Sequence, residues 1–301
     1  MNDDLAEPMS MTSSRPARRF DWRNLGLRSA SAAVLIPAVI GAIWAGHAPF
    51  LLMVAAAVAL LAKEWGGMSA GRGSPWVSAA LGLSVIAAVL WAAPSLYTPA
   101  WSAPWRQAWT MAPLALPLGA ALVAAVAWRL RERPGDAAFG VIYIGAPCLA
   151  LTWLQAMPNP KSWTILLCVV TWSADIFAFL VGNWLKGPKL WPRYSPNKTW
   201  TGFFGGLLGA MAAAMVASFA TAAFHGAELS TGFSLVIGLA GGLATMGGDL
   251  WESMLKRRYG VKDSGDLIPG HGGLLDRVDG LMVAALAVAG ARLIHQIGWA
   301  S

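Results

Sequence analysis

Long apolar runs that carry almost no charge are the feature that most limits how this chain can fold. They recur along most of the sequence, and many reach the length of about 20 residues that a helix needs to cross a bilayer. Only 12% of the 301 residues are charged, against about 25% in a soluble domain. Backbone polar groups cannot stay unpaired in lipid, and the runs lack the alternation of a membrane barrel. The sequence therefore predicts an all-α fold, a polytopic bundle of transmembrane helices.

Nine spans are expected along the chain. The second is short for a complete crossing, and an odd number places the two ends of the chain on opposite sides of the membrane. The approximate limits are Ala30–Gly46, Pro49–Leu61, Trp76–Ala93, Ala112–Trp128, Phe139–Met157, Trp163–Gly182, Gly202–Phe224, Thr231–Leu255 and Val278–Ile297.

The positions of the positive charges predict the orientation of these spans. With the N-terminus inside, the inside loops hold all but three of the 22 Lys and Arg residues; the exceptions are Arg106, Lys161 and Arg292. Cytoplasmic loops of membrane proteins are enriched in Lys and Arg, so the N-terminus is expected to be cytosolic. Because the net charge of +7 comes from short loops between apolar runs, the expected partner is a lipid bilayer and not nucleic acid.

Composition divides the chain into three segments. Residues 1–28 are expected to form a disordered cytosolic tail, 29–160 the N-terminal transmembrane helices, and 161–301 a C-terminal catalytic transmembrane region. The tail is polar and starts no early apolar core, unlike a cleaved signal peptide. Within the last segment, the glycine pairs Gly202–Gly206 and Gly238–Gly242 have the spacing that lets membrane helices pack closely.

Acidic residues are scarce and unevenly placed. Six of the fifteen fall between Asp249 and Asp279, beside basic residues and several glycines. Asp249, Glu252, Ser253 and Lys256 are spaced to line one face of the eighth helix, while Asp276 and Asp279 begin the ninth. The alternative is a solvated loop with structural ion pairs. The density of acid, base and glycine at the ends of two membrane helices favours a functional site.

Two carboxylate pairs that face each other across a helical hairpin suit a hard divalent cation. Magnesium usually takes one or two carboxylates and completes its shell with water and phosphate oxygens. The start of the ninth helix is expected to add free N–H groups and a positive dipole end for phosphate. Together these are the parts of a phosphoryl or nucleotidyl transfer site, in which positioning and charge stabilisation do most of the catalysis.

A second group of polar residues lies upstream. Asp175 is inside the sixth span, where an ionisable side chain is costly and points to function. The loop Ser195–Gly202 places Lys198 and two threonine hydroxyls just before the seventh helix, as a candidate anion site.

The segment from Ser253 to Asp279 resembles the signature of the phosphatidate cytidylyltransferase family, also called CDP-diacylglycerol synthases. It matches S-x-x-K-R, then K-D, then P-G-H-G-G, then D-R-x-D at the family's spacing. Asp175–Phe179 and Ser195–Trp200 also look like the family's second conserved region. Together the matches cover about a third of the chain.

The resemblance implies that the phosphate of phosphatidic acid attacks the α-phosphorus of CTP, forming CDP-diacylglycerol and diphosphate. It implies a metal site at Asp249 and Asp276 that holds magnesium, with or without potassium. It also implies an inner bacterial membrane and an active site that faces the cytoplasm. Separately, a Gly-rich helix face is compatible with a homodimer, although nothing in the sequence requires one. The implied catalytic residues are Asp249, Asp276, Lys256, Lys262, Asp263, His271, Arg277 and Asp279, and the implied substrate-binding residues are Ser195, Lys198, Thr199, Ser253, Arg257, Gly272 and Gly273.

Three residues depart from the family pattern. Phe179 stands where the family often has Tyr, Asn183 follows Gly182 where Arg is usual, and Thr201 stands in place of Glu. Two other functions remain open. The first is a membrane transferase that uses CDP-linked lipids, although its D-G-x-x-A-R pattern is absent. The second is a transporter, whose charges are expected nearer the bilayer midplane.

Overall fold

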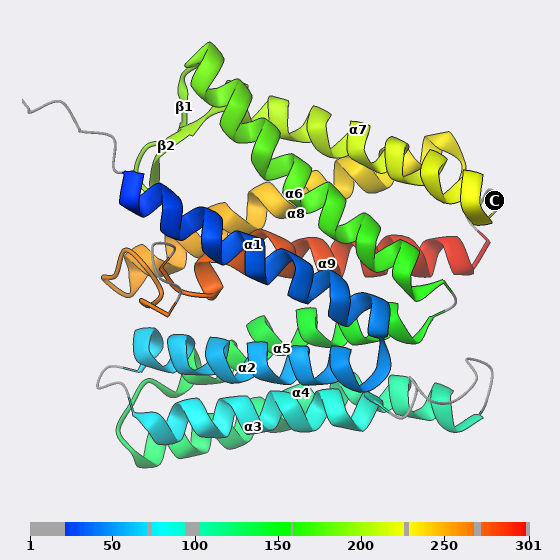
Figure 1. The fold of residues 1–301 in the computed structure, drawn as a ribbon. Coiled ribbons are helices and arrows are strands. Elements are labelled where there is room, and N and C mark those ends of the chain that lie inside the picture. The colour runs from blue at the N-terminus through cyan, green and yellow to red at the C-terminus, as the bar shows by residue number, and fades with distance from the viewer. Residues whose placement is uncertain are drawn as a thin grey trace, which may run out of the picture.

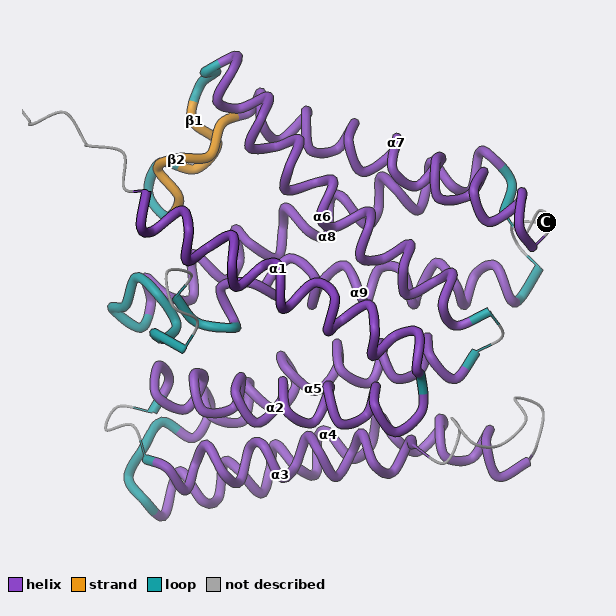
Figure 2. The backbone as a smooth tube through the Cα atoms, in the orientation of Figure 1, coloured by secondary structure: helices purple, strands orange, loops and turns teal. Residues whose placement is uncertain are grey.

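The computed structural model describes residues 22–70, 74–93, 103–157, 159–225, 229–267 and 272–298, and these form helices and one small hairpin (Figures 1 and 2). In chain order the elements are α1 Trp22–Ala45, α2 His47–Ser69, α3 Pro75–Ala92, α4 Ala103–Arg129, α5 Pro134–Ala156, α6 Pro160–Leu185, β1 Lys189–Trp191, β2 Ser195–Thr199, α7 Trp200–His225, α8 Thr231–Arg258 and α9 Leu275–Gln296.

The prediction of an all-α polytopic membrane fold is confirmed. Each predicted span corresponds to one helix. Over the described residues, seven helices are long and apolar enough to cross a membrane, namely α2, α3 and α5 to α9. The other two, α1 and α4, contain shorter apolar stretches at Ala33–Ala45 and Leu114–Arg129.

The helices run alternately up and down the bundle (Figure 1). The start of α1 and the connections that follow α4, α6 and α8 lie at the same end. The basic loops predicted to share one side of the membrane therefore do share one end of the molecule.

Several predicted boundaries are wrong, and packing explains the largest difference. We predicted that the second span ends at Leu61, but α2 continues to Ser69. Its last two turns contain Lys63 and Glu64, which break the apolar pattern. They remain helical because Trp65 is completely buried and donates a hydrogen bond to the backbone oxygen of Asp136, 3.0 Å away.

Three further boundaries differ. Helix α4 begins at Ala103, nine residues before the predicted start. Helix α9 begins at Leu275 and so includes Asp276 in its first turn. Helix α1 begins at Trp22, inside the segment expected to be a tail, of which residues 1–21 lie outside the described residues.

Close helix packing around the functional end depends on glycine, as the small-residue spacing indicated. A Cβ on Gly202 would lie 2.7 Å from the backbone oxygen of Ala178, so α7 packs tightly on α6. A Cβ on Gly238 would lie 2.6 Å from the Cα of Met211, on α7. Between α8 and α9, a Cβ on Gly248 would lie 2.7 Å from the backbone oxygen of Asp279.

The hairpin between α6 and α7 was not predicted. Its two short strands are antiparallel, with Lys189 opposite Thr199 and Trp191 opposite Ser195. The Thr199 hydroxyl accepts a hydrogen bond from the backbone N–H of Gly202 (3.1 Å), and the Thr201 hydroxyl accepts one from Gly187 (3.2 Å). These bonds fix the hairpin and the loop that enters it to the first turn of α7.

Candidate active site

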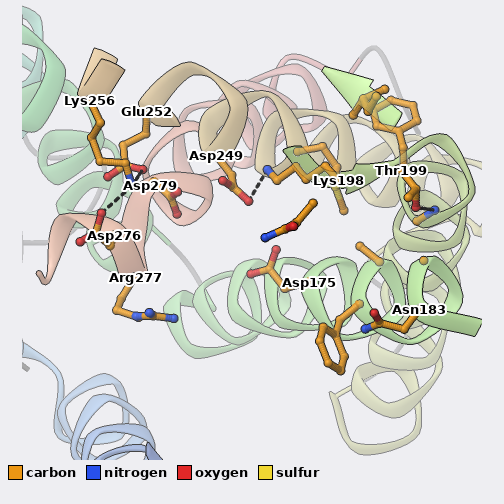
Figure 3. A pocket seen from close by; sticks show the side chains of 18 of the residues that line it. Asp175, Asn183, Lys198, Thr199, Asp249, Glu252, Lys256, Asp276, Arg277 and Asp279 are labelled. Atoms are coloured by element: carbon orange, nitrogen blue, oxygen red, sulfur yellow. Dashed lines mark hydrogen bonds and ion pairs between the residues drawn. The ribbon is translucent and has the colours of Figure 1, made fainter. Parts of the chain in front are cut away.

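A pocket of about 640 Å³ lies beside the hairpin (Figure 3). The hairpin stands at the end of the bundle where the basic loops gather (Figure 1). The volume of the pocket is typical of small-molecule sites. Helices α6, α7, α8 and α9, the hairpin, and the loop after α8 all contribute. The charged and amide side chains of its wall are Asp175, Asn183, Asn197, Lys198, Asp249, Glu252, Lys256, Asp263, Asp276, Arg277 and Asp279.

Negative charge dominates this wall. Six carboxylates face three cations, which leaves a formal excess of three negative charges. The carboxylates of Asp249, Glu252 and Asp175 lie close enough to Asp279 for their charges to interact with it. At the end of a membrane bundle the local dielectric constant is lower than in water, so such repulsion is strong. The pocket therefore attracts a cation.

The acidic and basic groups of α8 lie on one face, as their spacing predicts. Asp249, Glu252 and Lys256 all line the pocket. The Lys256 ammonium pairs with both Glu252 and Asp276, at 2.6 Å from a carboxylate oxygen of each. Glu252 is almost fully buried, with 1% of its side chain exposed. Lys256 thus joins α8 to the first turn of α9.

Both carboxylate oxygens of Asp276 have protein partners, although the residue also lines the pocket. Its Oδ1 pairs with Lys256. Its Oδ2 accepts hydrogen bonds from the backbone N–H groups of Ser264 (3.0 Å) and Gly273 (2.9 Å) and from the Ser264 hydroxyl (3.0 Å). Ser264 and Gly273, two described residues of the connection between α8 and α9, are therefore both tied to this one carboxylate.

Lys198 reaches from the hairpin to α8, where its ammonium pairs with the Asp249 carboxylate (Figure 3). Its neighbour Thr199 also lines the pocket, but the Thr199 side chain is buried and bonded to the start of α7. Of these two predicted residues, Lys198 directs its charge into the pocket, and Thr199 fixes this part of the hairpin to α7.

Asp175 lies ten residues before the end of α6, which is about 15 Å along the helix. It points into the pocket opposite Asp249 (Figure 3). Asn183, which departs from the family pattern, lines the same wall about two turns nearer the hairpin. The structure thus brings the upstream group and the signature segment into one pocket.

Some predicted residues lie outside this wall. Arg257 and Lys262 are exposed, and the Arg257 guanidinium donates to the backbone oxygen of Val261 at 3.5 Å. His271 lies outside the described residues. The other predicted residues that do not line the pocket are Ser195, Ser253, Gly272 and Gly273.

Sequence reasoning missed Glu64, a buried residue of α2 whose carboxylate reaches the start of α9. It accepts hydrogen bonds from the backbone N–H groups of Leu274 (2.7 Å) and Leu275 (2.8 Å). The N–H groups of Leu274 and Leu275 are therefore not free for phosphate, so that expectation is wrong for these two groups. A carboxylate inside an apolar run is itself a functional signal, and it was available in the sequence.

The end of α8 is anchored separately. The Arg258 guanidinium donates to the Asp136 carboxylate at the start of α5, over 2.9 Å. Burial, together with the negative charge of Asp136, raises the pKa of the Tyr259 phenol to about 12. Tyr259 is therefore uncharged at neutral pH, and it packs edge-on against Trp65.

Fold and pocket together define a class of protein. It is a polytopic membrane protein with a charged pocket at the end of the helical bundle where the basic loops gather.

The comparison with known families is more specific. The chain belongs to the cytidylyltransferase family, whose sequence model matches residues 26–294.

Relatives named phosphatidate cytidylyltransferase support this assignment. One from Brucella abortus is 42% identical over 172 residues, which cover 56% of this chain and 61% of that protein. One from Rickettsia felis is 40% identical over 151 residues, covering 48% of this chain and 65% of that protein. One from Bacillus subtilis is 44% identical over 117 residues, 38% of this chain and 41% of that protein. Each match spans less than two thirds of the relative.

Proposed function

We propose that this protein is a phosphatidate cytidylyltransferase, a nucleotidyltransferase of phospholipid biosynthesis that makes CDP-diacylglycerol and diphosphate from CTP and phosphatidic acid. A phosphate oxygen of phosphatidic acid attacks the α-phosphorus of CTP. The bond from that phosphorus to the oxygen bridging to the β-phosphorus breaks, and diphosphate leaves with the bonding electrons. The attacking phosphate is already ionised at neutral pH, so no serine or cysteine nucleophile is required.

The observation that carries the proposal is the pocket wall itself. Carboxylates from α6, α8 and α9 meet cations from the hairpin, α8 and α9 in one cavity at the end of the bundle. A lipid anchored in the bilayer presents its phosphate at that depth, and a soluble nucleotide enters from the adjoining water. Transporter charges, in contrast, are expected to line a path near the midplane.

The wall fits a divalent metal ion, although no group of three or more His, Cys, Asp or Glu among the described residues forms a ready-made metal cage. Six carboxylates supply hard oxygen ligands, and magnesium needs only one or two of them beside phosphate and water. Asp249 and Asp276 are proposed to hold the ion, with Asp279 and Asp175 close by. When bound, magnesium, with or without potassium, neutralises the triphosphate and stabilises charge on the leaving diphosphate.

The charge balance explains why a cation must accompany the nucleotide. A triphosphate that entered a wall with three excess negative charges would be repelled. The protein's own cations offset part of this repulsion. Lys198 and Arg277 face the pocket from opposite sides (Figure 3), where we propose that they contact phosphate. Lys256 holds Glu252 and Asp276 in place.

The remaining predicted residues keep their proposed roles. Lys262 and His271 are assigned to phosphate contacts from the loop after α8, beside Asp263 in the wall. Ser195, Ser253, Arg257, Gly272 and Gly273 are proposed to border the bound substrates. We further propose that the pocket faces the cytoplasm of a bacterium from its inner membrane. The Gly-rich faces of α7 and α8 already pack within the chain, so they do not support a homodimer.

A direct assay tests the proposed reaction. Purified protein is incubated with radiolabelled CTP, phosphatidic acid and magnesium, and the expected result is label in a lipid-soluble cytidine product. Asp249→Asn and Asp276→Asn should each abolish the product while the protein still purifies as a folded species. Absence of product from folded wild-type protein would instead favour a transferase that consumes CDP-linked lipids or a transporter.

A further inference from the structure

The start of α9 lacks a cap from its own neighbourhood. Leu274 stands at the N-cap position with helical backbone angles and an apolar side chain that cannot accept a hydrogen bond. The first N–H groups of any helix have no partner within the helix and need an acceptor from elsewhere. Asp276 lies in this first turn, so whatever fixes the turn also fixes the direction of Asp276.

Glu64 supplies the missing acceptor from α2, more than 200 residues away in the sequence. Its two carboxylate oxygens accept separately, Oε1 from Leu274 N–H and Oε2 from Leu275 N–H. Only 7% of the residue is exposed. Its negative charge also lies at the positive end of the α9 dipole, which stabilises it there.

Ser264 connects Glu64 to Asp276. Its hydroxyl oxygen is 3.1 Å from Glu64 Oε2 and 3.0 Å from Asp276 Oδ2. One hydroxyl has a single proton to donate, so it lies between two acceptors that compete for it. Ser264 is itself buried. A shift of the Glu64 carboxylate is therefore transmitted to the Asp276 carboxylate through one atom.

The glycines of the loop leave room for this arrangement. A Cβ on Gly273 would lie 2.7 Å from Glu64 Oε2, and one on Gly265 would lie 3.3 Å from Glu64 Cγ. Gly272 also has a positive φ of 80°, which disfavours other residues. Gly265 and Gly273 of the signature segment therefore leave space for the side chain of Glu64, which lies outside that segment.

We propose that Glu64 is a positioning residue for the pocket: with Ser264, it fixes the first turn of α9 so that Asp276 keeps its orientation. The inference rests on the proposed metal-dependent function of that pocket. Groups that orient a metal-binding carboxylate usually contribute 10–100-fold to metal affinity or activity. Removing Glu64 should therefore weaken cation binding by about that factor, although Glu64 does not line the pocket.

The test uses Mn²⁺ as the probe, followed by electron paramagnetic resonance in the purified full-length protein. Glu64→Gln keeps the size of the side chain but replaces one carboxylate oxygen with an NH₂ group. That group is a hydrogen-bond donor and cannot accept from the N–H groups of Leu274 and Leu275. Ser264→Ala removes only the connecting hydroxyl and leaves the cap of α9 intact. Lys63→Gln is the matched control, because it removes a charge from the adjacent, exposed residue of the same helix.

Glu64→Gln and Ser264→Ala should each raise the Kd for Mn²⁺ about tenfold, and Lys63→Gln should leave it within about twofold. The double variant should have a Kd for Mn²⁺ no higher than that of the single variant that binds less tightly, because both substitutions act through Asp276. In the enzyme assay, the magnesium concentration for half-maximal rate should rise and kcat should fall, while KM for phosphatidic acid should stay unchanged.

Wild-type Mn²⁺ affinity in Glu64→Gln would overturn the proposal, as would fully additive losses in the double variant. If Glu64→Gln does not fold, Ser264→Ala decides alone: normal Mn²⁺ binding overturns the proposal and weakened binding supports it. If the wild-type protein binds Mn²⁺ but forms no lipid-linked cytidine, the proposed reaction is contradicted. The Mn²⁺ affinities of the variants would still decide whether Glu64 positions Asp276.

Discussion

Individual side chains set the charge of the pocket. The two lysines in its wall have different surroundings: Lys256 is held between two carboxylates, whereas Lys198 has one partner and comes from the hairpin. Lys198 is also the more exposed, with 24% of its side chain accessible against 13% for Lys256. Lys198 is therefore the lysine better placed to exchange a carboxylate for an incoming phosphate.

Lys198→Met tests that role. The substitution raises the negative excess of the wall from three charges to four and removes a charged donor, and a hydrogen bond to a charged group is worth about 1.5–3 kcal/mol. The expected result is a rise in KM for CTP of about tenfold or more, measured by steady-state kinetics. Lys198→Arg should recover part of the loss. Lys189→Met on the same hairpin, an exposed cation outside the wall, should behave like wild type.

Contacts between neighbouring elements bring the charged side chains of the pocket together. Asp249 and Asp279 share the pocket because α8 and α9 pack backbone to backbone where Gly248 meets Gly280. The hairpin has a corresponding role for Lys198, since hydroxyl bonds of Thr199 and Thr201 tie the hairpin and the loop before it to the start of α7. Glycine and threonine at these points act through geometry and take no part in the chemistry.

Two adjacent glycines allow a matched test of this packing. A Cβ at Gly248 would meet the backbone oxygen of Asp279, whereas a Cβ at Gly247 meets nothing within 4 Å. Gly248→Ala should cost about 1–3 kcal/mol through overpacking and lower both the unfolding temperature and the activity. Gly247→Ala should be neutral or stabilising by up to about 1 kcal/mol. Equal unfolding temperatures for the two variants would contradict this account of the α8–α9 contact.

At the scale of the whole molecule, the alternation of helices gathers the basic loops and the hairpin at one end (Figure 1). The pocket lies at that end, because residues of the hairpin line it. The connection between α7 and α8 lies at the other end. Since charged loops resist translocation, the pocket end is expected to face the cytoplasm.

Single-cysteine labelling tests that orientation. The native Cys148 and Cys168 are both buried, so they should give little background with a membrane-impermeant maleimide. The first sample is cells with a permeabilised outer membrane and an intact inner membrane. In these cells Thr231→Cys, at the end opposite the pocket, should be labelled, whereas Arg193→Cys, on the hairpin, should not. In inverted inner-membrane vesicles the pattern should reverse. Labelling of Arg193→Cys from outside would place the pocket on the wrong side for cytosolic CTP.

Much of this fold follows from local pattern, because lipid allows few choices. A chain with repeated apolar runs must form helices, and each predicted span has its helix. The i, i+3, i+7 spacing placed Asp249, Glu252 and Lys256 on one helical face without knowledge of any neighbour. The loop chemistry was harder to predict, since the hairpin depends on hydroxyl bonds from Thr199 and Thr201 to neighbouring elements.

The sequence alone therefore determined the membrane class, the helix count, the alternation of ends and the acidic face of α8, all of which depend on residues close together in the chain. Only the tertiary structure decided which distant residues meet. Asp175 faces Asp249 across the pocket (Figure 3), and Glu64 caps α9 from α2. Such contacts depend on how helices stack. The spacing of small residues indicates where a backbone can be approached closely, but it does not say which distant residues that approach brings together.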